Sequence, residues 1–435
     1  MTKKVCMFVW NHFTNDARVL RECSALAEAG YEVDLIAIHD RKNPDLARKE
    51  VREEGFTVTR VHNTFPTGIG KVLGLSAKMK QFVTKNSYTL FLSFFLLAFA
   101  LWFMPIVTVV AGLLFGTLAT QKARTFLVRA YIAIQMVVQG MRKNYDIYHS
   151  NDLNTLPQGL VCAKLLRLRR KKLVYDSHEV QTSRTGYNSS MYGKMEAFYI
   201  KFTDIMINEN HTRAKYTEEL YGMYPEVVHN YPFVSRPEEN DVVNLHEMLN
   251  ISKEEPILLY QGGIQVGRGL DKLVQAAPHF KRGTLVFIGD GRIKPELEKM
   301  VADLGLQEKV KFISKVPIHE LLHYTRNAYV GFQVLNNICF NHYSASSNKL
   351  FEYMMSGVPV IACSFPEIQR VVEKENVGLC VDSHDPASIA EGVNHLLDHP
   401  ELREQMRENC FMAREKYNWE HEKHVLLAIY EKVSA

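Results

Sequence analysis

A glycine-rich turn in the second half of the chain is the first stretch whose residue types and spacing point to chemistry. In "LLYQGGIQVGRGLDKLVQA" (258–276) an apolar strand pattern ends at Gly262 and Gly263, and a helical pattern begins near Leu270. Glycines let a ligand approach the backbone closely, Arg268 adds a fixed positive charge, and the first amides of a helix bind anions. These features predict a diphosphate site. The alternative is a tight turn that carries a surface arginine.

A serine-rich turn and the helical pattern after it offer a second set of polar groups. In "SASSNKLFEYMMSGVPVIAC" (344–363) a helix is predicted from about Asn348, so its first amides and the hydroxyl of Ser344 can satisfy an anion, and Lys349 adds charge. Glu352 lies one turn inside this helix. A lone helical glutamate is usually a solvated surface group. A fully apolar strand pattern follows, however, so we interpret Glu352 as a site residue at a strand–helix junction that faces a cleft.

The end of the strand pattern "KLVYDSH" (172–178) adds a histidine. A neutral imidazole at His178 can donate a hydrogen bond to a phosphate or sugar oxygen; the alternative is a histidine that only ends a strand. Strand alternation places Asp176 on the same face as His178. The sequence contains no D-x-D and no His/Cys/Asp cluster with metal-ligand spacing. We therefore expect no metal and no other cofactor, and a diphosphate held by protein cations and amides.

Alternating strand and helix patterns must position these groups. Short apolar runs alternate with helical patterns almost throughout, which is typical of parallel α/β sheets, and 435 residues suffice for two domains. A polar connector with two prolines, 231–244, separates the two series of patterns. We expect two facing, Rossmann-like doubly wound domains, at 1–232 and 233–415, with a cleft at their strand ends. A last helix at 416–435 completes the chain.

The seven cysteines form no C-x-x-C pair and are odd in number, which favours reduced thiols in a cytosolic compartment. We expect all seven to be buried small hydrophobes. The first ten residues lack the pattern of a secretory signal and are typical of a strand. The cysteines are Cys6, Cys23, Cys162, Cys339, Cys363, Cys380 and Cys410.

An uncharged run from residue 86 to residue 121 interrupts the first half, and basic residues flank it. From Gly55 to Tyr145 there is no Asp or Glu but there are ten Lys or Arg. These charges flank the apolar run and do not interleave with aromatics on a polar surface. This arrangement favours an anionic membrane surface as a partner, and no nucleic acid is expected.

Pro105 divides the run into halves that are short for a membrane crossing, which needs about 20 residues. Both flanks feed one predicted sheet, so the chain must return to the side from which it entered, and basic flanks mark the cytoplasmic side. We expect residues 65–143 to be an inserted helical segment that anchors the protein through 86–121 at the cytoplasmic face of the cell membrane. It forms a re-entrant hairpin or two short spans. The alternative is a helical pair buried in an enlarged soluble domain.

Taken as a set, the motifs resemble family 4 retaining glycosyltransferases of the GT-B fold. The stretches "YQGGIQVGRGLDKLVQA", "LVFIGDG", "NKLFEYMMSGVPVIA" and "GLCVD" are similar to their donor domain. The stretches "NDARVLRECSALAEAGYEV", "YDSHEV" and "VVHNYP" are similar to their acceptor domain, and "YNWEHEKHVLLAIYEKV" to the closing helices, which in that fold cross back to the first domain. The resemblance covers nearly the whole chain except 65–143. It implies a GT-B fold and sugar transfer with retention of configuration.

The resemblance also implies roles for single residues. Glu352 matches the second glutamate of the family's E-x7-E motif, which holds the ribose of a nucleotide sugar, and Arg268 matches a basic residue of the phosphate loop. His178 matches the histidine beside the transferred sugar and the β-phosphate. The backbone that touches the diphosphate corresponds to Asn348, Lys349 and Leu350.

The chain departs from the family pattern at three places. Ser344 stands where the first glutamate of E-x7-E normally contacts sugar hydroxyls, and Gly263 stands where an arginine usually precedes the loop. "HFTNDAR" replaces an acceptor-side Gly-Gly turn, which leaves Asn15, Asp16 and Arg18 as the acceptor-side candidates.

We therefore expect a membrane-associated hexosyltransferase-type enzyme that moves a sugar from a nucleotide diphosphate sugar to a lipid-linked or saccharide acceptor, in cell-envelope polysaccharide or glycolipid synthesis. An epimerase or a phosphorylase is a second possibility, since both also use two facing α/β domains. A membrane-bound scaffold that binds nucleotide sugars without catalysis is the third, because Ser344 and Gly263 replace charged groups.

Overall fold

A computed structural model describes residues 2–43, 45–65, 78, 81–104, 120–166, 169–183, 189–234, 243–317 and 320–434. The chain divides into two compact units. The first comprises Met1–Asp176 and Lys201–Asp204, and the second comprises Ser177–Ile200 and Ile205–Ala435.

An eight-stranded sheet has the strand order β3-β4-β2-β1-β5-β6-β7-β8. Its parallel strands include nearly continuous apolar runs, as in β1 (KVCMF), because strands buried on both faces do not alternate. A short antiparallel edge strand, β3, pairs with β4 and was not predicted. The strands are β1 Lys4–Phe8, β2 Glu32–Ile38, β3 Lys49–Val51, β4 Thr57–Val61, β5 Ile147–Asn151, β6 Lys172–Ser177, β7 Ile205–Asn208 and β8 Glu226–Val227.

The helices of this part of the chain follow the predicted pattern. Helix α1 begins at Ala17 because the Asp16 carboxylate accepts a hydrogen bond from the amide of Val19 (3.1 Å), which satisfies one of the free donors at a helix start. After α6 the helix widens into a short π-helical turn at Val161–Leu165. The helices are α1 Ala17–Glu28, α3 Ser87–Phe103, α5 Gln121–Gly140, α6 Leu156–Leu160, α7 Ser189–Tyr199 and α8 His211–Tyr221.

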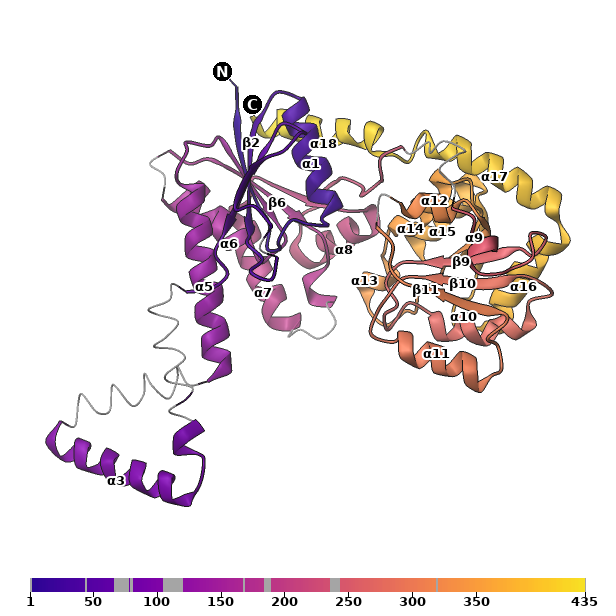
Figure 1. The fold of residues 1–435 in the computed structure, drawn as a ribbon. Helices are drawn as coiled ribbons and strands as arrows, with labels where there is room; N and C mark the ends of the chain where they lie inside the picture. The colour runs from indigo at the N-terminus through magenta and orange to yellow at the C-terminus, as the bar shows by residue number, and fades with distance from the viewer. Residues whose placement is uncertain are drawn as a thin grey trace. The chain divides into compact units, whose positions relative to one another are not determined.

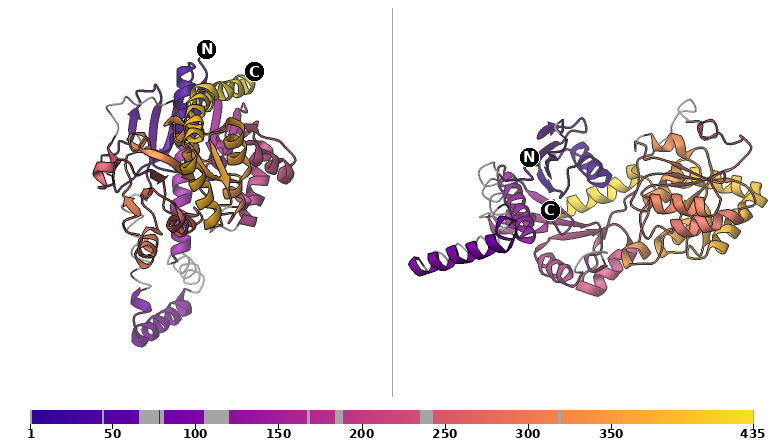
Figure 2. Two further views of the ribbon diagram at one scale, coloured as in Figure 1. Left: turned by 90° about the vertical axis from the view of Figure 1, so that its right-hand side faces the viewer. Right: turned by 60° about the horizontal axis from the view of Figure 1, so that its bottom comes forward.

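Helices α3 and α5 lie between β4 and β5 in the sequence, and Figures 1 and 2 show each as one continuous rod. Asn86 and Thr89 form a reciprocal capping box at the start of α3. Helix α5 buries Ile132, Met136 and Gly140, which follow one another at four-residue spacing and so share one face. Among the described residues, no helix has both the length and the apolar character that a membrane crossing needs. The predicted anchor falls partly on 105–119, which lie outside the described residues.

The six-stranded sheet of the second unit has the order β11-β10-β9-β12-β13-β14, and its strand pairs are parallel. The strands are β9 Ile257–Gln261, β10 Thr284–Ile288, β11 Val310–Ile313, β12 Ala328–Gln333, β13 Val360–Cys363 and β14 Gly378–Val381. The helices are α9 Leu245–Met248, α10 Leu270–Ala276, α11 Lys294–Asp303, α12 Leu321–Thr325, α13 Phe340–Tyr343, α14 Asn348–Met355, α15 Pro366–Glu375, α16 Pro386–Asp398, α17 Pro400–Arg414 and α18 Trp419–Ser434.

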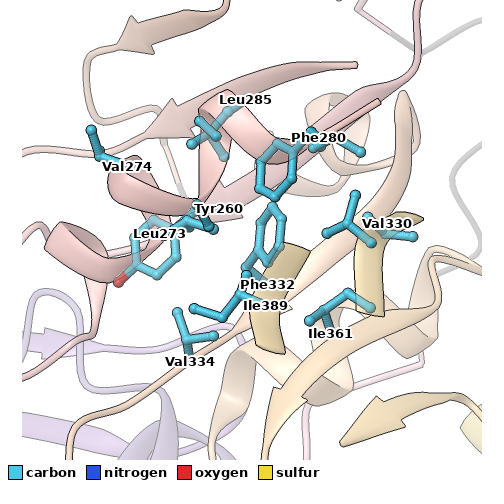
Figure 3. Close-up of a cluster of buried hydrophobic side chains, with 14 of the residues drawn as sticks. Tyr260, Leu273, Val274, Phe280, Leu285, Val330, Phe332, Val334, Ile361 and Ile389 are labelled. Carbon is cyan, nitrogen blue, oxygen red and sulfur yellow. The ribbon is translucent and has the colours of Figure 1, made fainter. Parts of the chain in front are cut away.

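Two buried apolar clusters, one for each face of this sheet, hold the second unit together. Figure 3 shows the cluster in which Tyr260 and Phe332 of the sheet meet Leu273 of α10 and Ile389 of α16. The other cluster packs α14 and α15 against the opposite face. Helix α18 contacts the segment that follows β8, where the amide of His229 donates to Glu422 (2.7 Å).

The seven cysteines are all free thiols. Five are buried as expected, but Cys339 and Cys380 are half-buried, so the prediction that all seven are buried is wrong for these two.

Candidate functional site

The glycine-rich loop connects β9 to α10 and contains backbone conformations that favour glycine. Gly262, Gly267 and Gly269 have φ values of 120°, 82° and 67°. The Tyr260 hydroxyl donates to the Gly263 carbonyl (3.0 Å), and this bond fixes the first part of the loop. Gly263 itself is exposed. At Gly262 and Gly263 the loop therefore offers backbone without side chains at the carboxyl end of β9.

The turn "GDG" at 289–291, which was not among the predicted site residues, supports this loop from below. A Cβ atom at Gly289 would lie 2.0 Å from the carbonyl oxygen of Gly262, and one at Gly291 would lie 2.0 Å from that of Ile264. The amide of Ile264 also donates to the Asp290 carbonyl (3.1 Å). Glycine is needed at both positions because the two backbones touch.

Two cations meet beside this loop. Arg268 is half-buried, whereas Lys349 of α14 is 8% exposed and its Nζ lies 5.5 Å from the centre of the Tyr260 ring. Burial and the nearby charge of Arg268 lower the pKa of Lys349 to about 7, and Glu352 opposes this shift. The predicted cations of the diphosphate site are thus brought together.

Glu352 is half-buried and is fixed by side chains that the sequence analysis missed. Its Oε2 accepts a hydrogen bond from Gln261 Nε2 (2.8 Å), and Gln261 Oε1 accepts one from the Thr325 hydroxyl (2.7 Å). The amide of Gln261 also donates to the hydroxyl of Tyr353 (3.1 Å). A polar residue that ends the apolar strand "ILLYQ" was the available signal for Gln261.

The first turn of α14 is built as predicted. The helix begins at Asn348, and Ser347, its N-cap residue, makes no side-chain capping bond. Asn348 is exposed and its Oδ1 accepts a hydrogen bond from Asn230 Nδ2 (3.3 Å), whereas Lys349 and Leu350 are buried.

Ser344 is fully buried, and its hydroxyl already has partners. The Oγ atom donates to the Phe340 carbonyl (2.7 Å) and accepts from Arg213 Nε (3.3 Å). The Ser344 carbonyl accepts from Asn210 Nδ2 (2.8 Å). The serine that replaces the first glutamate of the family motif therefore belongs to an internal hydrogen-bond network around Arg213 of α8.

The same network holds the loop that carries His178, which is half-buried. Arg213 Nη1 donates to the His178 carbonyl (2.7 Å). Asn341 of α13 makes two reciprocal bonds with the backbone of Val180, at 2.8 and 3.1 Å. Residues 177–183 thus lie against the segment that leads into α14. His178 is thereby brought to the vicinity of Ser344, because Arg213 contacts both residues.

The three acceptor-side candidates lie in the first unit and have different surroundings. Asn15 is exposed, and Asp16 caps α1. Arg18 is buried and makes two hydrogen bonds to the carboxylate of Asp176, at 2.6 and 2.9 Å. Arg18 and Asp16 therefore both have structural partners.

A buried cluster next to Arg18 has metal-ligand chemistry. Glu22, His149 and Asp176 each place one ligand atom within 4.8 Å of the others. The Arg18 guanidinium already pairs with the carboxylates of Asp176 (2.6 Å) and Glu22 (3.2 Å). Because a cation here would face this guanidinium, the cluster is better described as a buried ion-pair network than as a metal centre.

Comparison with known proteins agrees with this geometry. Residues 242–411 match the family described as glycosyl transferases group 1. The D-inositol 3-phosphate glycosyltransferase of Acidothermus cellulolyticus is 27% identical over 258 residues, which cover 55% of this chain and 56% of that protein. The chain spans about half the length of several of the curated relatives that it matches.

Two solved structures share the fold over almost the whole chain. Sucrose-phosphate synthase from Thermosynechococcus elongatus has a TM-score of 0.71 at 15% identity and covers 99% of both chains. Anabaena HepE in complex with UDP-glucose has a TM-score of 0.67 at 13% identity and covers 98% of this chain and 99% of that chain.

The fold is therefore the two-domain α/β GT-B fold that the resemblance implied. Residues 242–411 match the group 1 glycosyl transferases, and the resemblance to the family 4 glycosyltransferases is confirmed.

Proposed function

We propose that the protein is a glycosyltransferase that moves a sugar from a nucleotide diphosphate sugar to an acceptor hydroxyl. The observation that carries the proposal is the meeting of Arg268, Lys349 and Glu352 where the glycine-rich loop adjoins α14, within the family segment. A diphosphate on the exposed backbone of this loop meets two cations. A carboxylate one helical turn further along suits the hydroxyls of a ribose.

These residues fit the chemistry of the transfer. Breaking the bond between the sugar and the diphosphate builds negative charge on the leaving phosphate, and fixed positive groups stabilise that charge. Arg268 and Lys349 supply these positive groups, and Gln261 orients the Glu352 carboxylate. His178 is the candidate hydrogen-bond donor toward the transferred sugar. Retention of configuration is part of the proposal and rests on the family likeness alone.

The similar proteins narrow the choice of donor and acceptor compounds to test. HepE was solved with UDP-glucose, which makes this compound the first donor to test. Relatives named for inositol 3-phosphate keep a soluble phosphorylated acceptor open. A lipid-linked acceptor, used in cell-envelope polysaccharide or glycolipid synthesis, is the acceptor class that the apolar helix α3 favours.

Helix α3 exposes large apolar side chains on every face. Tyr88, Phe91, Phe94 and Trp102 are 71–88% exposed, and no residue of α3 carries a charge. A helix that is apolar all round is stable when hydrocarbon surrounds it. At 17 residues it is about 25 Å long, against about 30 Å for the hydrocarbon core. We propose that α3 dips into the cytoplasmic leaflet and holds the protein at the membrane face.

Replacing Phe91, Phe94 and Trp102 with asparagine is expected to lower partitioning onto anionic phospholipid vesicles at least about 100-fold, because each buried aromatic side chain contributes about 2 kcal/mol. Vesicle flotation measures this partitioning. The matched control replaces three exposed apolar residues outside α3, Val51, Leu304 and Met412, with asparagine and is expected to float like the wild type. Equal flotation of both triple variants contradicts the anchor.

The activity itself is tested with detergent-solubilised protein. The protein is incubated with UDP-, GDP- and ADP-sugars labelled in the sugar, together with lipid extract, inositol phosphate or an oligosaccharide. We expect label to appear in one acceptor fraction. A requirement for inorganic phosphate without nucleotide indicates a phosphorylase, and donor binding without transfer or hydrolysis indicates a scaffold. Either result overturns the proposal.

A further inference from the structure

We propose that Lys349 is a proton-linked element of the donor site, which gains a proton when a nucleotide diphosphate sugar binds, so that donor affinity falls as the pH rises above neutral. This inference rests on the proposed function, because it concerns the same site. It adds a regulatory property that neither the family likeness nor the motif supplies.

The surroundings of Lys349 are unusual for an ammonium group. The side chain is more than nine-tenths buried, and its Nζ lies over the Tyr260 ring at 5.5 Å from the ring centre. Within the described part of the chain, no carboxylate forms an ion pair or hydrogen bond with it. Glu352, the carboxylate whose charge favours the ammonium, accepts a hydrogen bond from Gln261 (2.8 Å). A buried charge without a direct counter-ion is costly, so the resting side chain favours the neutral amine.

The lysine is also within reach of the predicted ligand. A Cβ atom built on Gly262 would lie 3.4 Å from Lys349 Cδ and 3.9 Å from its Nζ. The amine therefore ends beside the side-chain-free backbone on which a diphosphate is proposed to rest. Gly263 stands where the family has an arginine, so Lys349 occupies a site that lacks one positive charge.

Binding of a diphosphate changes the balance of charges around the amine. In the resting site Arg268 repels the ammonium form, whereas Glu352 favours it. A bound diphosphate adds negative charge at short range, which stabilises the ammonium and raises the pKa of Lys349 above its resting value of about 7. Between the resting and bound pKa values, each bound donor therefore takes up as much as one proton.

Tyr260, Cys363 and His342, three other titratable groups near this site, do not titrate in the same range. Burial raises the pKa values of Tyr260 and Cys363 to about 12. Burial and the nearby charge of Arg268 lower the pKa of His342 below its ordinary value. Proton uptake above pH 7 that disappears in Lys349→Arg is therefore assigned to Lys349. Below pH 7 Lys349 is charged with or without the donor, so donor affinity does not change with pH. Above pH 7 the free site loses this proton, so donor affinity declines as the pH rises.

The test is isothermal titration calorimetry with UDP-glucose from about pH 7 to about pH 8.5, in two buffers of different ionisation enthalpy. The diphosphate of this ligand is esterified at both ends and does not titrate in this range. If UDP-glucose does not bind, GDP- and ADP-glucose are titrated in the same way. We expect proton uptake and an affinity that falls about five- to tenfold per pH unit.

Lys349→Met is expected to bind more weakly and to show less than about a twofold change across the range. Lys349→Arg, which stays charged at every pH, is also expected to lose the dependence of donor affinity on pH. Lys299→Met, on the exposed surface of α11, is expected to keep the pH dependence of the wild type. Two results overturn this inference and leave the proposed function intact. One is donor binding by the wild type without proton uptake, and the other is proton uptake that persists in Lys349→Arg. Failure to bind all three nucleotide sugars overturns both.

Discussion

Arg268→Met is expected to lower kcat/KM for the nucleotide sugar about 100- to 1000-fold. Removing one fixed group that stabilises charge on a leaving oxygen costs roughly this much in other enzymes. The loss is expected to be large here because Gly263 stands where a second loop arginine usually lies. Steady-state transfer assays measure it, and the loss is expected in kcat as well as in KM, since the leaving-group charge is greatest in the transition state.

The matched control for this prediction is Arg282→Met. Arg282 is an exposed arginine of the same unit, outside the glycine-rich loop. Its substitution changes the net charge equally but is expected to leave kcat/KM within about twofold, because exposed charges at a distance are screened by salt. Similar losses in both variants would show that Arg268 acts only through the overall charge, which contradicts its place in the site.

Gly289→Ala is expected to lower the free energy of unfolding by about 3 kcal/mol and to reduce Tm by about 6–12 °C. The added Cβ atom would lie 2.0 Å from the carbonyl oxygen of Gly262, a backbone atom that cannot move aside without moving the glycine-rich loop. Gly289 also has a φ of 153°. Donor binding is expected to weaken together with stability. Thermal denaturation followed by circular dichroism measures the first effect.

Gly305→Ala separates the steric clash from backbone strain. Gly305 has a φ of 67°, which also favours glycine, but nothing lies within 4 Å of its Cβ position. Its substitution is expected to lower the free energy of unfolding by only about 1–2 kcal/mol. If Gly289→Ala is no more destabilising than Gly305→Ala, the packing of the "GDG" turn under the loop is wrong.

Much of the fold was predictable because parallel sheets buried on both faces use continuous apolar runs, and such runs are visible in the sequence. Strands such as β9 and β13 coincide with the predicted ones. The edge strand Lys49–Val51 was missed because it is three residues long and mostly exposed, so it carries no apolar signal. The membrane anchor is a proposal, because the second half of the predicted segment, 105–119, lies outside the described residues.

The site was predictable only in part. Loop glycines, a charged helix start and the E-x7-E spacing pointed to Arg268 and Glu352. The roles of Gln261 and of Arg213 depend on tertiary contacts between segments distant in sequence, and no local pattern marks such contacts. Ser344 illustrates the same limit, because its burial beneath Arg213 follows from the packing of α8 and not from its spacing to Glu352.

The central claim is that the loop at Gly262 and helix α14 together form a nucleotide diphosphate sugar site. The most direct measurement is a thermal-shift screen of the purified protein with UDP-, GDP- and ADP-sugars. A ligand at a hundredfold excess over its Kd stabilises the folded state by about 2.7 kcal/mol. We expect one of these sugars to raise Tm by several degrees in the wild type and in Arg282→Met, and the shift to disappear in Arg268→Met and Glu352→Ala. An unchanged Tm with every sugar, or an equal shift in all four proteins, would contradict the claim.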